Sequence, residues 1–331
     1  MQMDFKSSAK RRTLLMAALA AFACFGIVLS MSRGSVDIPW AEALEALGGD
    51  ISGAHGQILY NIRLPRTIVA LLVGINLALS GAILQAVMRN PLADPHIIGI
   101  SSGAGIFGIL IMLAFPAYAY LITPAAFIGA MGAAVLIYIL AWKNGISPLR
   151  IVLAGVAVSA FFGAGISALL IFYSDRVHGA LMWMVGGLSA RSWPQVEMLW
   201  PYTLLGVILA FWGARHLNIL QLGDELAKGL GLRVGLARIA LSAIAALLAA
   251  SAVSVVGLLG FVGLIVPHTA RLLIGSDYRW LLPATALLGA GTVTVCDTVA
   301  RIAFAPVELP VGIIMAIIGA PFFLFLLRRE L

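Results

Sequence analysis

The stretch Asn61–Leu72, NIRLPRTIVALL, places Arg63 and Arg66 at the start of an apolar run that continues to residue 88. A run of this length is typical of a helix that crosses a lipid bilayer, because about 20 apolar residues span the hydrocarbon core. Pro65 suits the first turn of such a helix, where its missing N–H costs no hydrogen bond. Two arginines so close together are more than one lipid anchor needs, so their role depends on the side of the membrane they face.

The composition of the whole chain places it in a membrane. Of its 331 residues 62% are hydrophobic and only 11% are charged, and the mean hydropathy is +1.05. Water-soluble domains carry roughly 25% charged and 45–50% apolar residues. The sequence therefore predicts an all-α polytopic membrane protein, with residues 1–331 forming a single transmembrane domain.

Ten apolar windows mark the expected membrane-spanning helices, of which the eighth is short. The first is longer than the 7–15 apolar residues of a signal peptide, so we expect it to be a spanning helix rather than a cleaved leader. The windows are 13–32, 64–88, 96–115, 119–142, 150–173, 195–214, 236–257, 261–275, 281–300 and 311–327.

The distribution of basic residues predicts the orientation of the chain. If both termini are cytoplasmic, fifteen lysines and arginines lie inside and six lie outside, as the positive-inside rule requires. The protein is then a multi-pass protein of a bacterial cytoplasmic (inner) membrane, in contact with membrane lipid. The six outside are Arg33, Arg63, Arg66, Arg176, Arg191 and Arg301.

Three of these outer arginines, Arg63, Arg66 and Arg301, lie at helix ends. One interpretation is that they snorkel to lipid phosphates. The other is that they form a cationic docking face for an acidic partner outside the membrane. Four residues before Arg301 lies Asp297, which is either a pathway or proton-relay acid or the partner of Arg301 in an i,i+4 pair.

Several other function classes are disfavoured. The net charge of +7 does not form a basic patch, so we expect no nucleic-acid partner. The sequence of Gly103–Gly108 matches G-x-G-x-x-G but lacks the strand and the acid of a dinucleotide site, and no phosphate-binding P-loop is present. Cys24 and Cys296 lie in apolar runs and the histidines are scattered, so we expect no metal site and no cofactor. His268, in VPHTAR, is expected to cap the start of a helix.

The sizeable hydrophilic loop on the expected cytoplasmic side lies within residues 216–235. Its segment DELAKGL reads as a short amphipathic helix with Leu226 and Leu230 on one face, ended by Gly229 and Gly231. It is either an ordinary solvated connector or a helix that fits into a groove of a partner protein.

Dense small residues, including 35 glycines, predict a tightly packed helix bundle. Prolines at helix breaks are tolerated at membrane depth only inside protein or beside a watery path. The bundle is therefore expected to enclose a pathway.

The sequence resembles the permease subunits of the bacterial ATP-binding-cassette (ABC) importers for ferric siderophores, haem and vitamin B12 (FecCD/BtuC-like, type II importers). The blocks that carry the resemblance run in order from about residue 60 to the C-terminus. They are RLPRTIVALLVGINLALSGAILQAVMRNPLADPHIIGISSGAG, MWMVGGLSARSW, LNILQLGDELAKGLGL, GFVGLIVPHTARLLIGSDYRWLLPATALLGAGTVTVCDTVARI and ELPVGIIMAIIGAPFFLFLL.

The resemblance implies a transport subunit that is not an enzyme. Two permease chains would form the pathway, two separate ATPase subunits would dock below, and a periplasmic or lipid-anchored binding protein would deliver substrate. Arg63, Arg66 and Arg301 would meet acidic residues of that binding protein. The residues implied to couple to the ATPase are Leu222, Gly223, Asp224, Glu225 and Lys228. The candidates for the pathway or its gate are Met182, Met184, Ser189 and Asp297.

The cargo is expected to be an iron(III)–siderophore complex, with haem, cobalamin and oxyanions such as molybdate as alternatives. Whether the second permease chain is identical or different stays open. A proton- or sodium-coupled secondary transporter is the competing class, since such proteins carry ionisable groups near the membrane midplane. A membrane oxidoreductase is disfavoured because His96, His178 and His268 lie near the ends of segments rather than in pairs.

Overall fold

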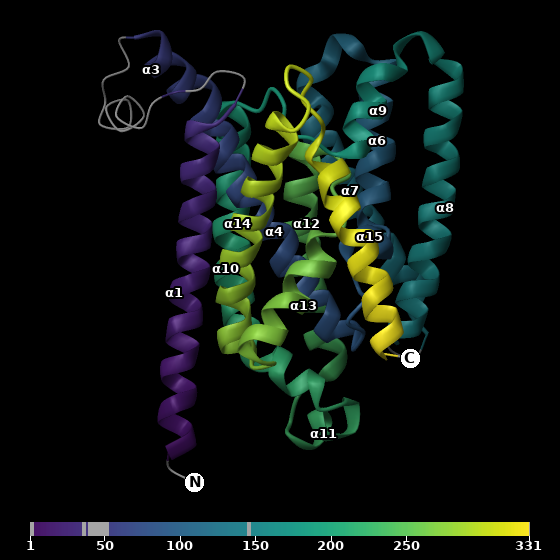
Figure 1. Cartoon of the computed structure of the whole chain (residues 1–331). Helices are drawn as coiled ribbons and strands as arrows, with labels where there is room; N and C mark the ends of the chain where they lie inside the picture. The colour runs from purple at the N-terminus through teal and green to yellow at the C-terminus, as the bar shows by residue number, and fades with distance from the viewer. Residues whose placement is uncertain (1–2, 35–37, 39–52, 144–146, 331) are drawn as a thin grey trace.

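The computed structural model describes residues 3–34, 38, 53–143 and 147–330, and in these ranges the chain is helical with no strand (Figure 1). The elements are α1 (Met3–Ser32), α3 (Ala54–Ile58), η1 (Leu59–Arg63), α4 (Leu64–Met88), α5 (Pro95–Ile98), α6 (Ile100–Ala114), η2 (Pro116–Leu121), α7 (Ile122–Ala141), α8 (Pro148–Phe172), η3 (Ser174–Arg176), α9 (Val177–Val185), α10 (Trp193–Gln221), α11 (Asp224–Gly229), α12 (Val234–Val256), α13 (Val262–Ile274), α14 (Tyr278–Ile302) and α15 (Val311–Glu330).

The spanning helices match the ten apolar windows. Within the described residues, seven helical segments are long and apolar enough to cross a membrane, and three shorter apolar helices are α6, α13 and the Val311–Leu324 part of α15. The prediction of an all-α polytopic membrane protein is therefore confirmed. The third window differs in detail, because Gly99 breaks it into α5 and α6 with a left-handed backbone (φ 99°) that suits glycine.

Helix α4 is the centre of the bundle and packs against α10, α12, α13 and α14. Two glycines allow the closest approaches. A Cβ added at Gly74 would lie 2.2 Å from the carbonyl oxygen of Gly289 in α14, and one added at Gly81 would lie 1.9 Å from that of Gly263 in α13. The expected tight packing through small residues is present at these crossings, since no larger side chain fits there.

The start of α13 corrects one expectation. His268 does not cap a helix start: α13 begins at Val262, after Phe261 with φ 67°, and His268 is buried inside it with its ring 5.9 Å from that of Phe322. The misleading signal was Pro267, which lies within the helix. A proline there leaves the carbonyl of Gly263 without its helical donor, and the amide of Gln85 donates to that oxygen instead (3.3 Å).

The two ends of the bundle carry different features (Figure 1). Helix α11 and both chain termini lie toward one end, here called the α11 end. Helix α3, η1 and the connection between α14 and α15 lie at the opposite end, here called the α3 end. The termini thus share one side, as the charge distribution predicts, and the assignment of that side to the cytoplasm stays a prediction.

Candidate functional site

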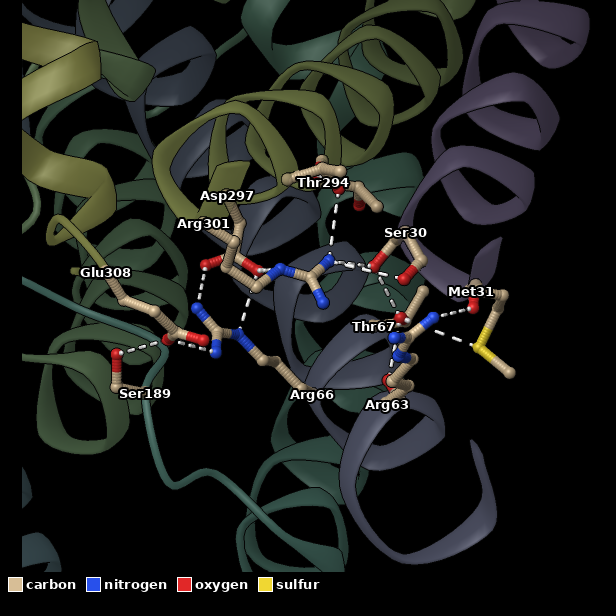
Figure 2. A network of polar contacts seen from close by, with 11 residues as sticks. Ser30, Met31, Arg63, Arg66, Thr67, Ser189, Thr294, Asp297, Arg301 and Glu308 are labelled. Atoms are coloured by element: carbon tan, nitrogen blue, oxygen red, sulfur yellow. Dashed lines mark hydrogen bonds and ion pairs between the residues drawn. The ribbon is translucent and has the colours of Figure 1, made fainter. Parts of the chain in front are cut away.

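A buried ion-pair network occupies the α3 end (Figure 2). Arg66, in the first turn of α4, donates from Nε and Nη2 to the two carboxylate oxygens of Asp297 in α14, both at 2.9 Å. Its Nη1 donates to Glu308 at 2.8 Å, and the hydroxyl of Ser189 donates to the same Glu308 oxygen at 3.4 Å. One guanidinium thus joins α4, α14 and the connection that leads to α15.

The other two arginines of this region bind the end of α1. Arg63 donates to the carbonyl oxygens of Met31 (2.7 Å) and Ser32 (3.0 Å). Arg301 donates to the carbonyl (3.3 Å) and the hydroxyl (2.8 Å) of Ser30. The last carbonyls of a helix lack intrahelical donors and carry its negative dipole end. The two cations therefore fix the C-terminal end of α1 against α4 and α14.

The structure brings the three predicted docking arginines together, but they face inward. Arg63 is 3% exposed, Arg66 6% and Arg301 4%, so none is displayed on the free surface of the chain. The expected i,i+4 pair between Asp297 and Arg301 is confirmed at 3.4 Å, although Arg66 is the closer partner of that carboxylate. Docking through these arginines stays a prediction, and it now requires the network to open.

Sequence reasoning missed Glu308 as a member of this network. Its side chain is 34% exposed. The hydrogen bond and charge of Arg66 outweigh partial burial and hold the pKa of Glu308 below its ordinary value. The available signal was an acid seven residues after Arg301, in the short connection to the last helix.

The pathway candidates separate in the structure. Met184 lines a cavity of about 600 Å³ between α5, α9, α13 and α15, together with His96, Phe261 and Ile313. Met182 and Ser189 are exposed and do not line this cavity, although they are close to Met184 in the sequence. Asp297 is buried in the arginine network, where it is 1% exposed. In the described part of the chain no group of three His, Cys, Asp or Glu side chains is placed to hold a metal ion.

Helix α11 at the other end forms as the sequence predicts, with one correction. Gly223 precedes it with φ 99°. Gly231, with φ 83°, follows the helix and ends it. Its N–H donates to the carbonyl of Lys228 (2.9 Å), and the N–H of Leu232 donates to the carbonyl of Ala227 (3.0 Å). This pattern is a C-terminal motif that favours glycine at the left-handed position. Gly229 is the last helical residue rather than the cap.

An ion pair fixes α11 to the bundle. Arg238, one turn into α12 and only 3% exposed, donates to both carboxylate oxygens of Asp224 at 2.9 and 2.7 Å. Sequence reasoning assigned Asp224 to coupling but missed Arg238, which it counted only as a cytoplasmic charge. A two-point contact of this kind restricts orientation as well as distance.

The outer face of α11 is apolar at its centre and charged at its edge. Leu226 is 63% exposed and Leu230 62%, and Leu222 before the helix is also exposed. Glu225 accepts a hydrogen bond from Lys228 at 2.9 Å, which raises the pKa of Lys228. Asp224, Glu225 and Lys228 of the predicted coupling residues therefore lie on this projecting helix, and Leu222 and Gly223 lead into it. The side chains of Leu226 and Leu230 are exposed beside them.

A helical bundle of ten apolar segments, with a largely apolar cavity and a projecting helix at one end, is the architecture of a membrane transport subunit. The profile of the FecCD transport family matches residues 22–329, and the chain belongs to that family. It is thus a permease of the FecCD type and a multi-pass protein of the inner membrane.

Individual relatives agree along nearly the whole chain. The Fe(3+)-citrate import system permease protein YfmD of Bacillus subtilis is 38% identical over 97% of this chain and 98% of its own length. The cobalamin import system permease protein BtuC of Halobacterium salinarum is 41% identical over 96% of this chain and 88% of its own. A solved structure of an inward-facing transporter, assigned to the metal-chelate type of ABC transporter, has a TM-score of 0.85 and 30% identity over 96% of this chain and 99% of that one.

Proposed function

We propose that this permease, as a single domain of residues 1–331, forms half of the membrane pathway of an ATP-driven importer for iron(III)–siderophore complexes. The proposal that transport is driven by ATP rests on the position and exposed face of α11. Asp224 and Arg238 hold it rigidly against the bundle, while Leu226 and Leu230 project from it. An amphipathic helix presented in this way suits insertion into a groove of a partner protein.

The partner at the α11 end is an ATPase subunit, and two such subunits serve a pair of permeases. A motion of the ATPase reaches α12 through the Asp224–Arg238 ion pair, because this contact transmits rotation as well as translation. The drive works only if the ATPase binds the two states of the permease with different affinity. This assignment makes the α11 end cytoplasmic.

The partner at the α3 end is a binding protein that docks through Arg63, Arg66 and Arg301. Since these arginines are buried, we assign the first step to Glu308, the partly exposed member of the network. A carboxylate of the binding protein replaces Glu308 on Nη1 of Arg66, while Asp297 keeps the other two donors. Partly exposed pairs contribute about 0–1 kcal/mol each, so docking is reversible, as delivery requires.

The cargo assignment rests on the relatives and on the cavity beside Met184. Iron–citrate and cobalamin permeases resemble this chain about equally, so the common property is a large chelate of a metal ion. The largely apolar lining of the cavity, with Asp94 and His96 as its titratable members, fits weak contact with such a cargo rather than tight binding. We favour an iron(III)–siderophore complex, with haem, cobalamin or molybdate as the alternatives, and a second permease chain, identical or different, as the other half of the pathway.

Docking can be tested separately from transport with the Glu308→Gln variant. Removing this internal carboxylate frees Nη1 of Arg66, so the affinity for the binding protein at low salt is expected to rise. Asp175→Asn is the matched control, since Asp175 is an exposed acid of the short helix η3, and among the described residues its ion pair is with its neighbour Arg176. An unchanged affinity in Glu308→Gln would contradict docking on Arg66.

A further inference from the structure

A polar cavity of about 310 Å³ opens at the α11 end, where the end of α4 meets α10, α13 and the start of α14. Its lining includes two arginines, Arg89 and Arg271, and the neutral groups Gln85, Gln221 and Tyr278. None of the described residues that line it is acidic. Two positive charges thus share one small space without a carboxylate among its lining residues.

Neutral groups hold Arg271 in this cavity. Its Nη2 donates to Oε1 of Gln85 (3.0 Å) and to the hydroxyl of Tyr278 (3.4 Å). Gln85 is itself oriented by its amide, which donates to the carbonyls of Gly263 and Leu264 in α13, and the Tyr278 hydroxyl donates to Ala82 (2.9 Å). The guanidinium is therefore positioned by fixed partners that leave its charge uncompensated.

Arg89 directs the second charge toward the segment that precedes α11. It ends α4 in a left-handed conformation (φ 51°), which is uncommon for a residue with a side chain. Its side chain is exposed, and no described residue forms an ion pair with it. A Cβ added at Gly223 would lie 3.6 Å from this guanidinium, so the cavity adjoins the start of α11.

We propose that Arg89 and Arg271 form a carboxylate-binding pocket that receives an acidic side chain of the ATPase subunit docked on α11. The inference rests on the proposed function, because it presumes that the ATPase covers α11. A protein seated over Gly223 and α11 also covers Arg89. Removing an unpaired guanidinium from water is unfavourable, and a carboxylate that accepts from it in fork geometry offsets this cost.

The position of the cavity favours a protein carboxylate over a lipid phosphate. The cavity lies among the ends of α4, α10, α13 and α14, beside the helix that we assign to the ATPase contact. Gln221, which lines it, lies two residues before Gly223. The pocket and α11 therefore form one continuous surface, so a partner that binds Leu226 and Leu230 reaches both.

The test measures the affinity between the permease in lipid nanodiscs and the labelled ATPase subunit with which the wild type forms an ATP-hydrolysing complex. The variants are Arg89→Gln and the charge-preserving Arg89→Lys. Arg279→Gln is the matched control, since Arg279 is an exposed arginine next to Tyr278 that does not line the cavity. Nanodiscs with and without phosphatidylglycerol separate a lipid site from a protein site.

We expect the dissociation constant of Arg89→Gln to rise about tenfold or more and its salt dependence to weaken, in both kinds of nanodisc. Arg89→Lys should retain most of the affinity, and Arg279→Gln should match the wild type. Equal affinity of Arg89→Gln and the wild type at low salt would overturn the pocket while leaving the proposed function intact, and a loss confined to phosphatidylglycerol nanodiscs would assign the pocket to lipid instead. Failure of the wild type to bind any ATPase would overturn the proposed function, and the pocket with it.

Discussion

Arg66 in α4 and Asp297 in α14 form an ion pair with two hydrogen bonds of 2.9 Å, in a place where Asp297 is 1% exposed. Removing one partner of an isolated buried pair costs about 3–5 kcal/mol, because the other charge is left without compensation. Here Arg301, 3.4 Å from Asp297, reduces that cost. The pair therefore contributes to holding α4 against α14 at the α3 end.

The first prediction concerns this pair. Arg66→Ala should lower the thermal unfolding midpoint of the purified permease markedly, because among the described residues Asp297 then keeps only its longer contact with Arg301 (3.4 Å). Arg66→Lys, which keeps a positive charge between Asp297 and Glu308 but not the two-point contact, should lose less. The measurement is thermal unfolding in detergent. Arg176→Ala, which removes an exposed arginine of the same end, should have little effect. An Arg66→Lys variant no more stable than Arg66→Ala would contradict this account of the pair.

The second prediction concerns pH at the α3 end. Arg66 holds the pKa of Glu308 below its ordinary value of 4.5, so the folded state binds this proton less readily than the unfolded state. The stabilisation is complete above pH 4.5 and is lost as the pH falls through the lowered pKa. The difference in unfolding midpoint between the wild type and Glu308→Gln should thus be present at pH 7 and vanish in acid, with a free energy below about 1 kcal/mol. A difference that grows toward acid pH would have the wrong sign.

The third prediction concerns the packing of α4. Gly81→Ala would place a methyl group 1.9 Å from the carbonyl oxygen of Gly263, which only a backbone shift can relieve, so the variant should express poorly or aggregate. Gly132→Ala in α7 is the matched control, since nothing lies within 4 Å of its added Cβ. It should be neutral or stabilise the helix by up to about 1 kcal/mol. Size-exclusion profiles of both proteins provide the comparison, and equal profiles would refute the close approach.

The hydropathy of the sequence was sufficient to predict the spanning helices, because a helix in lipid needs a long apolar run however it packs against its neighbours. The ends of α11 were nearly predictable from Gly223 and Gly231, since left-handed positions favour glycine. The Arg66–Asp297 contact was not, because its partners are 231 residues apart and meet only when Gly74 and Gly289 let α4 and α14 approach. For the same reason the sequence showed three arginines at helix ends but not that they face inward.

The fourth prediction concerns the link between α11 and α12. Asp224→Asn weakens the contact with Arg238, so the ATPase should still bind through the leucines while substrate transport per ATP hydrolysed falls by about tenfold, an effect of about 1.4 kcal/mol. Arg279→Gln is the control, because Arg279 is an exposed charge at the same end of the bundle and is not among the predicted coupling residues. The ratio of transport to hydrolysis in proteoliposomes is the quantity to compare. An unchanged ratio in Asp224→Asn would show that the ion pair is not a mechanical link.

The fifth prediction tests the central claim most directly. Proteoliposomes would contain the permease with its ATPase and enclose ATP, with the binding protein and radiolabelled iron(III)–siderophore outside. The account predicts accumulation of iron that requires both ATP and the binding protein. Repeating the assay with haem or cobalamin in place of the iron(III)–siderophore complex then shows which cargo is preferred. Accumulation driven by an imposed proton gradient in the absence of ATP would contradict it.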